Sequence, residues 1–258
     1  GMISGGGFLV YFSAEMGWYG LFVVMGGLVA AVFSLLIFFK EAPADPVASS
    51  ESMTLSKVFR VLLQAVRTPA ARWLLITVAT YKLGESLIDG MFKLYLLDSG
   101  YTVSTIALWV STYGMAASIL GSVAGGVLAM RIPLWRALFV TSTIRILPLI
   151  GIALLALGPP SDLAVIGLTL AEHFCGGALT TVMFATMMSH IDSRIGATHF
   201  TVLATVEVLG KSPGFIASGF LAAFWGYPAL FGLGALLSLA FLLILLGLKA
   251  HMAPASGK

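Results

Sequence analysis

Apolar runs of about 20 residues recur from one end of this chain to the other, separated by polar connections. Each run is long enough to cross a bilayer as a helix, and the runs are continuous, whereas the strands of a membrane β-barrel alternate. Only 10% of the residues are charged, against roughly 25% in an ordinary soluble protein. The sequence therefore predicts an all-α, polytopic membrane helix bundle.

The connections between these runs are short, with one exception. The expected spans follow a partial helix over 1–14 and cover 18–39, 73–97, 105–129, 137–157, 163–188, 200–224 and 227–249. The long connection, 41–70, begins with a stretch rich in Pro, Ser and Ala, which is typical of a solvated linker. Its second part, 54–67, combines helical spacing of apolar residues with basic ones. This favours an amphipathic helix on the membrane surface over a plain basic linker.

Basic residues are distributed unevenly between the two sets of connections. If every span crosses the membrane, one set holds ten of the 14 Lys and Arg residues: Lys40, Lys57, Arg60, Arg67, Arg72, Arg131, Arg136, Arg194, Lys249 and Lys258. The opposite set holds Glu15, Asp98 and Asp162 and no basic residue. Because Lys and Arg mark the cytoplasmic side, we expect the 41–70 linker and the C-terminus to be cytoplasmic in a multi-pass membrane protein. The basic residues then contact lipid head groups, and nucleic acid is not an expected partner.

A weak internal repeat links the two ends of the chain. Residues 1–22 align without a gap with residues 210–231, so that Gly17 meets Gly226 and a Leu-Phe pair recurs in both copies. Six spans separate the copies, as in transporters built from two parallel six-span halves. We therefore expect the chain to be the C-terminal portion of a longer protein, and a truncated fragment without transport activity stays an alternative.

Ionisable side chains occur near the centre of four separate spans. They are Glu85, Arg145, Glu172 and Lys211. A charge at that depth costs roughly 2.5–3.5 kcal/mol even on mild scales, so such residues face a protein interior or a water-filled cavity. On the 73–97 span, Lys82, Glu85 and Asp89 share one face with Lys93, within an arc of about 80°. The pattern predicts a polar cavity for a charged solute and a proton, and the alternative is a set of ion pairs that only fix helix packing.

The candidate residues for substrate binding or proton coupling are Tyr81, Lys82, Glu85, Asp89, Glu172, His173, Glu207 and Lys211. The cations suit anionic groups of a solute, and the carboxylates and imidazole suit proton exchange. Arg145, with Pro148 one turn later, is expected to be a structural charge. Lys93 lies near the outer end of its span, where its long side chain can extend to the interface.

Small residues recur at every fourth position in the 105–129 span. They are Ala117, Gly121, Gly125 and Ala129. This spacing predicts close contact with a neighbouring helix, and a sliding face for alternating access is the alternative.

The stretch GGVLAMRIPLWR (125–136) resembles the Gly-rich, basic inter-helix motif of the Major Facilitator Superfamily. In it Met130 stands near the place of the usual acidic residue, which puts a gating role of that loop in doubt. Three further stretches resemble the branch of the acetyl-coenzyme A transporters and bacterial muropeptide permeases: TYKLGES (80–86), EHFCGGALTTVMFATMM (172–188) and ATHFTVLATVEVLGK (197–211).

The resemblance implies a division of the chain into four parts. Residues 1–40 would end an N-terminal half with a partial helix and one full helix, and 41–70 would be the cytoplasmic linker. Residues 71–250 would form the C-terminal six-helix half, and 251–258 a cytoplasmic tail. The resemblance places the candidate residues on cavity-lining and flanking helices, and Arg145 on a supporting helix.

The implied activity is secondary transport by alternating access, with an anionic metabolite such as acetyl-coenzyme A as the solute. A proton symporter of muropeptides or other solutes is the alternative. An enzyme using His173 as a base would need a nucleophile or acceptor pocket, which the sequence does not offer. We therefore expect no catalytic residue, no metal and no cofactor. The single cysteine, Cys175, excludes an intrachain disulfide.

Overall fold

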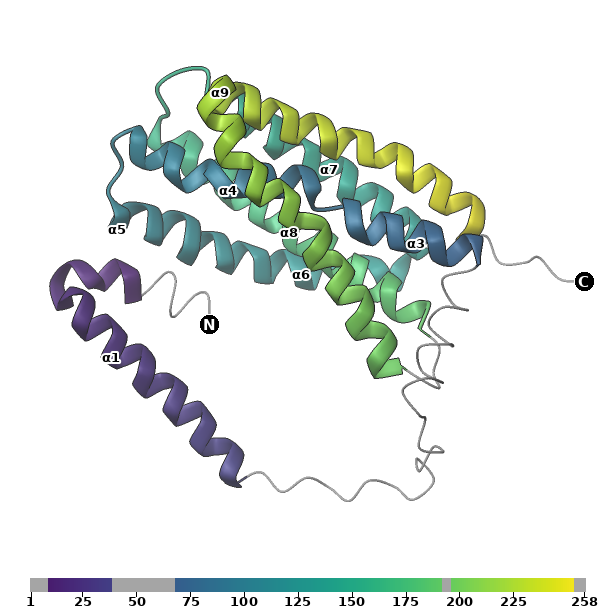
Figure 1. Cartoon of the computed structure of the whole chain (residues 1–258), viewed down its shortest axis with the longest axis horizontal. Coiled ribbons are helices and arrows are strands. Elements are labelled where there is room, and N and C mark those ends of the chain that lie inside the picture. The colour runs from purple at the N-terminus through teal and green to yellow at the C-terminus, as the bar shows by residue number, and fades with distance from the viewer. Residues whose placement is uncertain (1–8, 39–67, 192–195, 253–258) are drawn as a thin grey trace, which may run out of the picture.

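The computed structural model describes residues 9–38, 68–191 and 196–252, and every element in these ranges is a helix (Figure 1). The elements are α1 (Leu9–Phe38), α3 (Pro69–Thr80), α4 (Leu83–Asp98), α5 (Val103–Ile106), the π-helix η3 (Ala107–Tyr113), α6 (Gly114–Arg131), α7 (Leu134–Leu155), α8 (Asp162–Ser189) and α9 (Gly196–Met252). The predicted all-α bundle is confirmed. The surface helix expected over 54–67 lies outside the described residues.

Four helical stretches of the described residues are long and apolar enough to cross a membrane: Val103–Arg131, Leu134–Leu155, Asp162–Ser189 and His199–Lys249. The last has 51 residues, about twice what one crossing needs. It reverses direction at Gly226, whose φ of 76° favours glycine, so α9 consists of two arms (Figure 1). Gly17 in α1 has nearly the same backbone conformation, with φ 69° and ψ 166° against 76° and 168°. The two glycines that the internal repeat aligns therefore mark equivalent kinks.

The expected 73–97 span is two helices rather than one. α3 ends at Thr80 and α4 begins at Leu83, with Tyr81 and Lys82 between them. The N-terminal arm of α9 packs on this break, because Gly210 brings its backbone against the carbonyl of Ala79 and Gly214 lies against Ser86. The length of the apolar run predicted one continuous span over 73–97. It did not predict the break at Tyr81 and Lys82, which depends on the neighbouring helix.

The expected small-residue stripe packs α6 against α8. A Cβ atom added at Gly121 would overlap the carbonyl oxygen of Phe174, and one at Gly125 would overlap that of Ala178. The packing interpretation is confirmed: without side chains at these positions the two helix backbones approach closely.

Two apolar clusters fill the bundle, one toward each end. The first contains Leu138 of α7, Leu179 of α8 and Phe241 of α9. The second contains Leu149 of α7 and Val165 of α8. Along α7 and α8 the charged residues of the bundle interior come between members of the two clusters. The apolar clusters thus enclose a polar layer from both sides.

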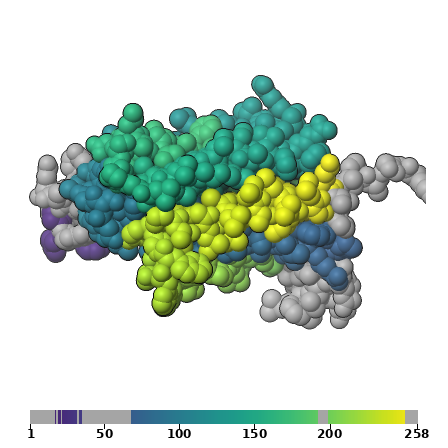
Figure 2. All heavy atoms as spheres, turned by 90° about the horizontal axis from the view of Figure 1, so that it is seen from above, coloured from purple at the N-terminus to yellow at the C-terminus, as the bar shows by residue number. Residues whose placement is uncertain are grey.

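The two ends of the bundle differ in charge. At one end Trp135 lies under two cations, Arg136 at 5.4 Å and Lys249 at 4.6 Å from its ring centroid. In Figure 2, α7 and the C-terminal arm of α9, which carry these residues, lie side by side.

The opposite end carries two tyrosine–aspartate contacts. Tyr227 donates to Asp98, and Tyr101 donates to Asp162 at 2.9 Å. Burial raises the pKa of Tyr101 above its ordinary value, and its hydrogen bond to the Asp162 carboxylate raises that pKa further. The chain thus gathers cations at one end of the bundle and carboxylates at the other.

Helix α1 contacts the rest of the protein at α5 and η3. Figure 1 shows the remainder of α1 running away from the other helices. The candidate site described next is therefore built by α4, η3, α6, α7, α8 and α9.

Candidate functional site

A polar cavity opens between α4, α6, α8 and the N-terminal arm of α9, in two adjoining hollows. One has a volume of about 340 Å³ and the other about 400 Å³. Both are lined by Asp89, Met115, Glu172, His173 and Phe215. Six of the eight candidate residues line the cavity: Lys82, Glu85, Asp89, Glu172, His173 and Lys211. The structure therefore brings together the charges that the sequence placed at one depth on separate spans.

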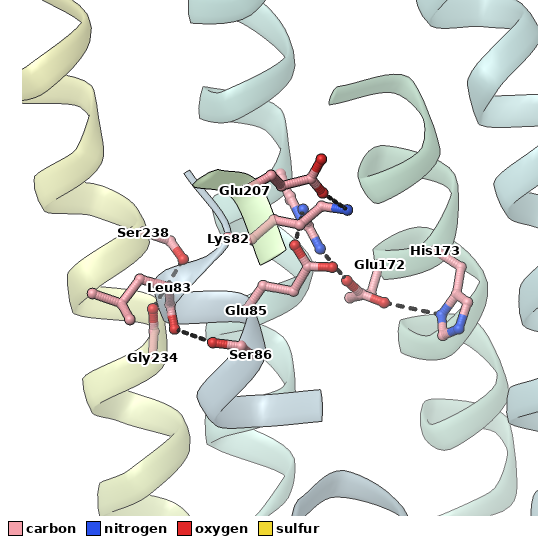
Figure 3. Close-up of polar contacts among 10 residues, drawn as sticks. Lys82, Leu83, Glu85, Ser86, Glu172, His173, Glu207, Gly234 and Ser238 are labelled. Carbon is pink, nitrogen blue, oxygen red and sulfur yellow. Dashed lines mark hydrogen bonds and ion pairs between the residues drawn. The ribbon is translucent and has the colours of Figure 1, made fainter. Parts of the chain in front are cut away.

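Arg145 of α7 joins the carboxylates of two other helices. Its Nη1 lies 2.7 Å from Glu85 Oε2 of α4, and its Nη2 lies 2.6 Å from Glu172 Oε1 of α8. The guanidinium is 3% exposed, so the two ion pairs are shielded from solvent. Figure 3 shows the Glu85 and Glu172 side chains converging on one point. The sequence predicted that Arg145 is a structural charge, and in the structure this residue forms ion pairs with both cavity carboxylates.

His173 follows Glu172 on α8 and is oriented by it. The imidazole Nδ1 lies 2.9 Å from Glu172 Oε2 and 3.0 Å from the Thr169 carbonyl oxygen (Figure 3). Both partners accept hydrogen bonds, so Nδ1 carries a hydrogen. Nε2 is on the side of Gly114, where a Cβ atom would lie 2.8 Å from it. Nε2 is therefore the ring nitrogen of His173 that can gain or lose a proton, while Glu172 and Thr169 fix the orientation of the ring.

A second ion pair joins the start of α4 to α9. Lys82 Nζ lies 3.2 Å from Glu207 Oε1 (Figure 3). Lys82 lines the cavity, whereas Glu207 is buried behind it. The sequence predicted both residues for the site and placed Glu207 at its edge. Tyr81, the remaining candidate, is buried beside Arg145 instead of lining either hollow.

Three charged side chains line the cavity without an ion-pair partner among the described residues. They are Asp89, Lys93 and Lys211. Lys93 was expected to extend to the interface, but its Nζ donates to Ser111 Oγ of η3 at 3.1 Å and lines the first hollow. The signal that could have placed it there is its spacing of four residues from Asp89 on one helix face.

The cavity chemistry follows from these contacts. Within the described residues, no group of three His, Cys, Asp or Glu side chains is positioned to hold a metal ion. The lining instead offers two ammonium groups, one carboxylate and one imidazole to a ligand, between apolar patches such as Met115 and Phe215. Such a lining suits a solute that carries charges of both signs together with apolar surface.

A polytopic helical bundle with a charged cavity at mid-depth has the architecture of a membrane transport protein. The chain belongs to the Major Facilitator Superfamily, which it matches over residues 1–214. It is a multi-pass membrane protein of that family.

Curated relatives carry permease and transporter names. The chain is 25% identical over 221 residues to the anhydromuropeptide permease of Escherichia coli strain K12, covering 82% of this chain and 43% of that protein. It is 24% identical to putative transporter AmpG 4 of Rickettsia conorii, covering 87% and 55%. It is 23% identical to the Rickettsia felis protein of the same name, covering 96% and 61%. The chain thus spans about half the length of the relatives it matches.

Proposed function

We propose that this chain forms one wall of the solute pathway in a secondary transporter that works by alternating access. The observation that carries the proposal is a set of three charges, Asp89, Lys93 and Lys211, which line one cavity and have no ion-pair partner among the described residues. Unpaired charge at membrane depth is costly unless it has a use, and binding a charged solute is such a use. The other interior charges are already paired, so they support the wall instead of competing for the ligand.

The solute that fits this lining carries both acidic and cationic or donor groups. Lys93 and Lys82 are separated by eleven residues, which is about 16 Å along a helix. Lys211 lines the same hollow as Lys82, so cations occur toward both ends of the cavity with Asp89 between them. We therefore infer a solute with at least two separated anionic groups and a cationic or hydrogen-bonding group between them.

A peptide-bearing amino sugar of the muropeptide class has groups of both kinds. The name of the Escherichia coli relative points to the same class. Acetyl-coenzyme A, the anionic metabolite expected from the sequence, would use the cations but leave Asp89 facing phosphate. We therefore place the muropeptide class first.

Proton coupling is assigned to His173 and Asp89. The two carboxylates of Glu85 and Glu172 and the guanidinium of Arg145 have a net charge of −1 when all are ionised. Protonation of His173 at Nε2 would bring the net charge of these four side chains to zero. Asp89 lines both hollows beside His173 and has no ion-pair partner among the described residues. A proton arriving at either residue would change the charge that a solute meets.

We propose a cytoplasmic location for the end that carries Arg136 and Lys249. Their shared contact with Trp135 supports one basic end, and basic ends face the cytoplasm. The division of the chain at 40 and 70, with 71–250 as a C-terminal six-helix half, is proposed on the same grounds of family resemblance. A cysteine introduced at Arg136 should react with an impermeant thiol reagent only from the cytoplasmic side.

The test of the function is ligand binding and uptake by the purified chain. A purified anhydromuropeptide should raise the melting temperature in detergent and should enter proteoliposomes faster when the outside is acidic. Hydrogen bonds to charged groups are worth about 1.5–3 kcal/mol, so Asp89→Asn and Lys211→Met should each weaken binding by roughly 10- to 150-fold.

Arg131→Met is the matched control, because this exposed cation lies outside the cavity. Unchanged binding by Asp89→Asn and Lys211→Met together would refute the proposed site. Stabilisation by acetyl-coenzyme A and not by the muropeptide would refute the solute class. Binding without uptake would support the site and show that this chain does not transport by itself.

A further inference from the structure

A second, much smaller cavity lies beside Arg145, and the two hollows of the candidate site do not include it. Its volume is about 10 Å³, and it is bordered by Tyr81 at the break between α3 and α4 and by residues of α4, α7, α8 and α9. Its polar lining consists of Tyr81, Glu85, Ser142, Arg145 and Ser238. Glu85 lines both this cavity and the larger hollow.

Five polar atoms of these lining residues are buried without a hydrogen bond among the described residues. Two of them, Arg145 Nη1 and Glu85 Oε2, form an ion pair with each other at 2.7 Å. The other three are Tyr81 Oη, Ser142 Oγ and Arg145 Nε. The three side chains belong to residues that are only 3%, 4% and 3% exposed. A buried polar group without a partner is costly, and native proteins nearly always supply one. The fourth polar group, Ser238 Oγ, differs because it donates to the Gly234 carbonyl oxygen at 2.9 Å (Figure 3).

The donor and acceptor properties of the three unpaired atoms limit which molecule could form hydrogen bonds with them. Arg145 Nε is a donor only, whereas the hydroxyls of Tyr81 and Ser142 can each donate or accept. One molecule that pairs with all three would accept from Arg145 and exchange hydrogen bonds with both hydroxyls. A water needs about 10–15 Å³ and two to four polar partners, and this cavity offers that volume and three partners. A cation would face the Arg145 guanidinium, and an anion would face the Glu85 carboxylate.

We propose that this cavity binds one ordered water molecule, which accepts from Arg145 Nε and bridges to Tyr81 Oη and Ser142 Oγ. The water binds Nε of the Arg145 guanidinium, whose Nη1 and Nη2 already form ion pairs with Glu85 and Glu172. It also ties Tyr81, at the break between α3 and α4, to α7. The inference depends on this cavity alone and stands whether or not the chain transports a solute.

The direct test is an experimental structure of the full chain at a resolution that shows waters in the large cavity. Density for one water within hydrogen-bonding distance of Tyr81 Oη, Ser142 Oγ and Arg145 Nε is expected. An empty cavity, or a Tyr81 hydroxyl that bonds directly to Ser142 or to the nearby Glu207 carboxylate with no water beside it, would overturn the proposal.

Two variants give an independent thermodynamic test. Ser142→Val places methyl groups in the cavity and expels the water, so Arg145 Nε and Tyr81 Oη stay unpaired and the melting temperature should fall by roughly 2–10 °C. Ser238→Ala lines the same cavity but removes no partner of the water, so it is the matched control and should change much less. Ser142→Ala keeps the water with one bond fewer and should lie between the two. If Ser142→Val is as stable as Ser238→Ala, no water is bound there.

Discussion

Replacement of Arg145 by methionine tests whether the ion pairs of the bundle interior are required for its stability. The side chain is 3% exposed and forms ion pairs with both Glu85 and Glu172, whose side chains are 15% and 7% exposed. Methionine fills similar volume but leaves both carboxylates without their cation. Removing one partner of a buried ion pair costs about 3–5 kcal/mol, and Glu172, as the less exposed carboxylate, should account for most of it.

The measurement is thermal unfolding in detergent, followed by the fluorescence of the tryptophans. One kcal/mol shifts the melting temperature of a chain near this size by about 2–4 °C, so Arg145→Met should lower it by roughly 6–20 °C. The double variant Arg145→Met/Glu172→Gln removes the stranded charge as well and should recover part of the loss. Arg131→Met deletes an exposed cation and should stay within about 0.5 kcal/mol of the parent.

Equal melting temperatures for Arg145→Met and Arg131→Met would contradict a stabilising role of these ion pairs. The same role would be contradicted if adding Glu172→Gln made the Arg145→Met chain less stable still. Either result would mean that the carboxylates find other partners or water when the guanidinium is removed.

Two further predictions concern helix packing and the acidic end of the bundle. Gly121→Ala should cost about 1–3 kcal/mol, because a Cβ atom there overlaps the Phe174 carbonyl and forces α6 and α8 apart. Gly126→Ala, whose Cβ atom would meet only Thr181 at 3.8 Å, is the control, and equal melting temperatures for the two variants would contradict the packing. The raised pKa of Tyr101 means that its contribution to stability is complete below the ordinary tyrosine pKa of about 10 and is lost as the pH rises above it. Tyr101→Phe should therefore lose less thermal stability than the parent between about pH 9 and 11, and an identical loss would exclude this residue as the cause.

The helical class and the membrane setting could be predicted from the sequence because they depend on local properties. An apolar run of sufficient length has few alternatives to a membrane helix, whatever its neighbours are. The alignment of Gly226 with Gly17 was a sequence signal for the kink at Gly226. Both glycines adopt a positive φ, which glycine tolerates best, so the same turn recurs with the same residue.

The depth of the charged residues could also be predicted from the sequence, because it depends only on how far each residue lies from the ends of its span. Glu85, Glu172 and Lys211 were assigned to one level of separate spans, and they line one hollow. Their chemical roles in transport remain predictions.

The partners of these charges were not readable from the sequence. Arg145 was expected on a supporting helix, yet it contacts Glu85 and Glu172 because of how α7 is rotated and packed against α4 and α8. Lys93 was expected at the interface, and its contact with Ser111 depends on the π-helix η3 beside it.

Sequence alone thus determined that this chain is a bundle of membrane helices with ionisable groups near mid-depth. Span length and residue position are set within each helix, so no tertiary contact is needed to read them. The tertiary structure decided which charges are paired, where the 73–97 span breaks, and which side chains enclose the cavity. Those features depend on the rotation and packing of helices that are far apart in the sequence, and the free energy of a buried ion pair exists only once both partners are in place.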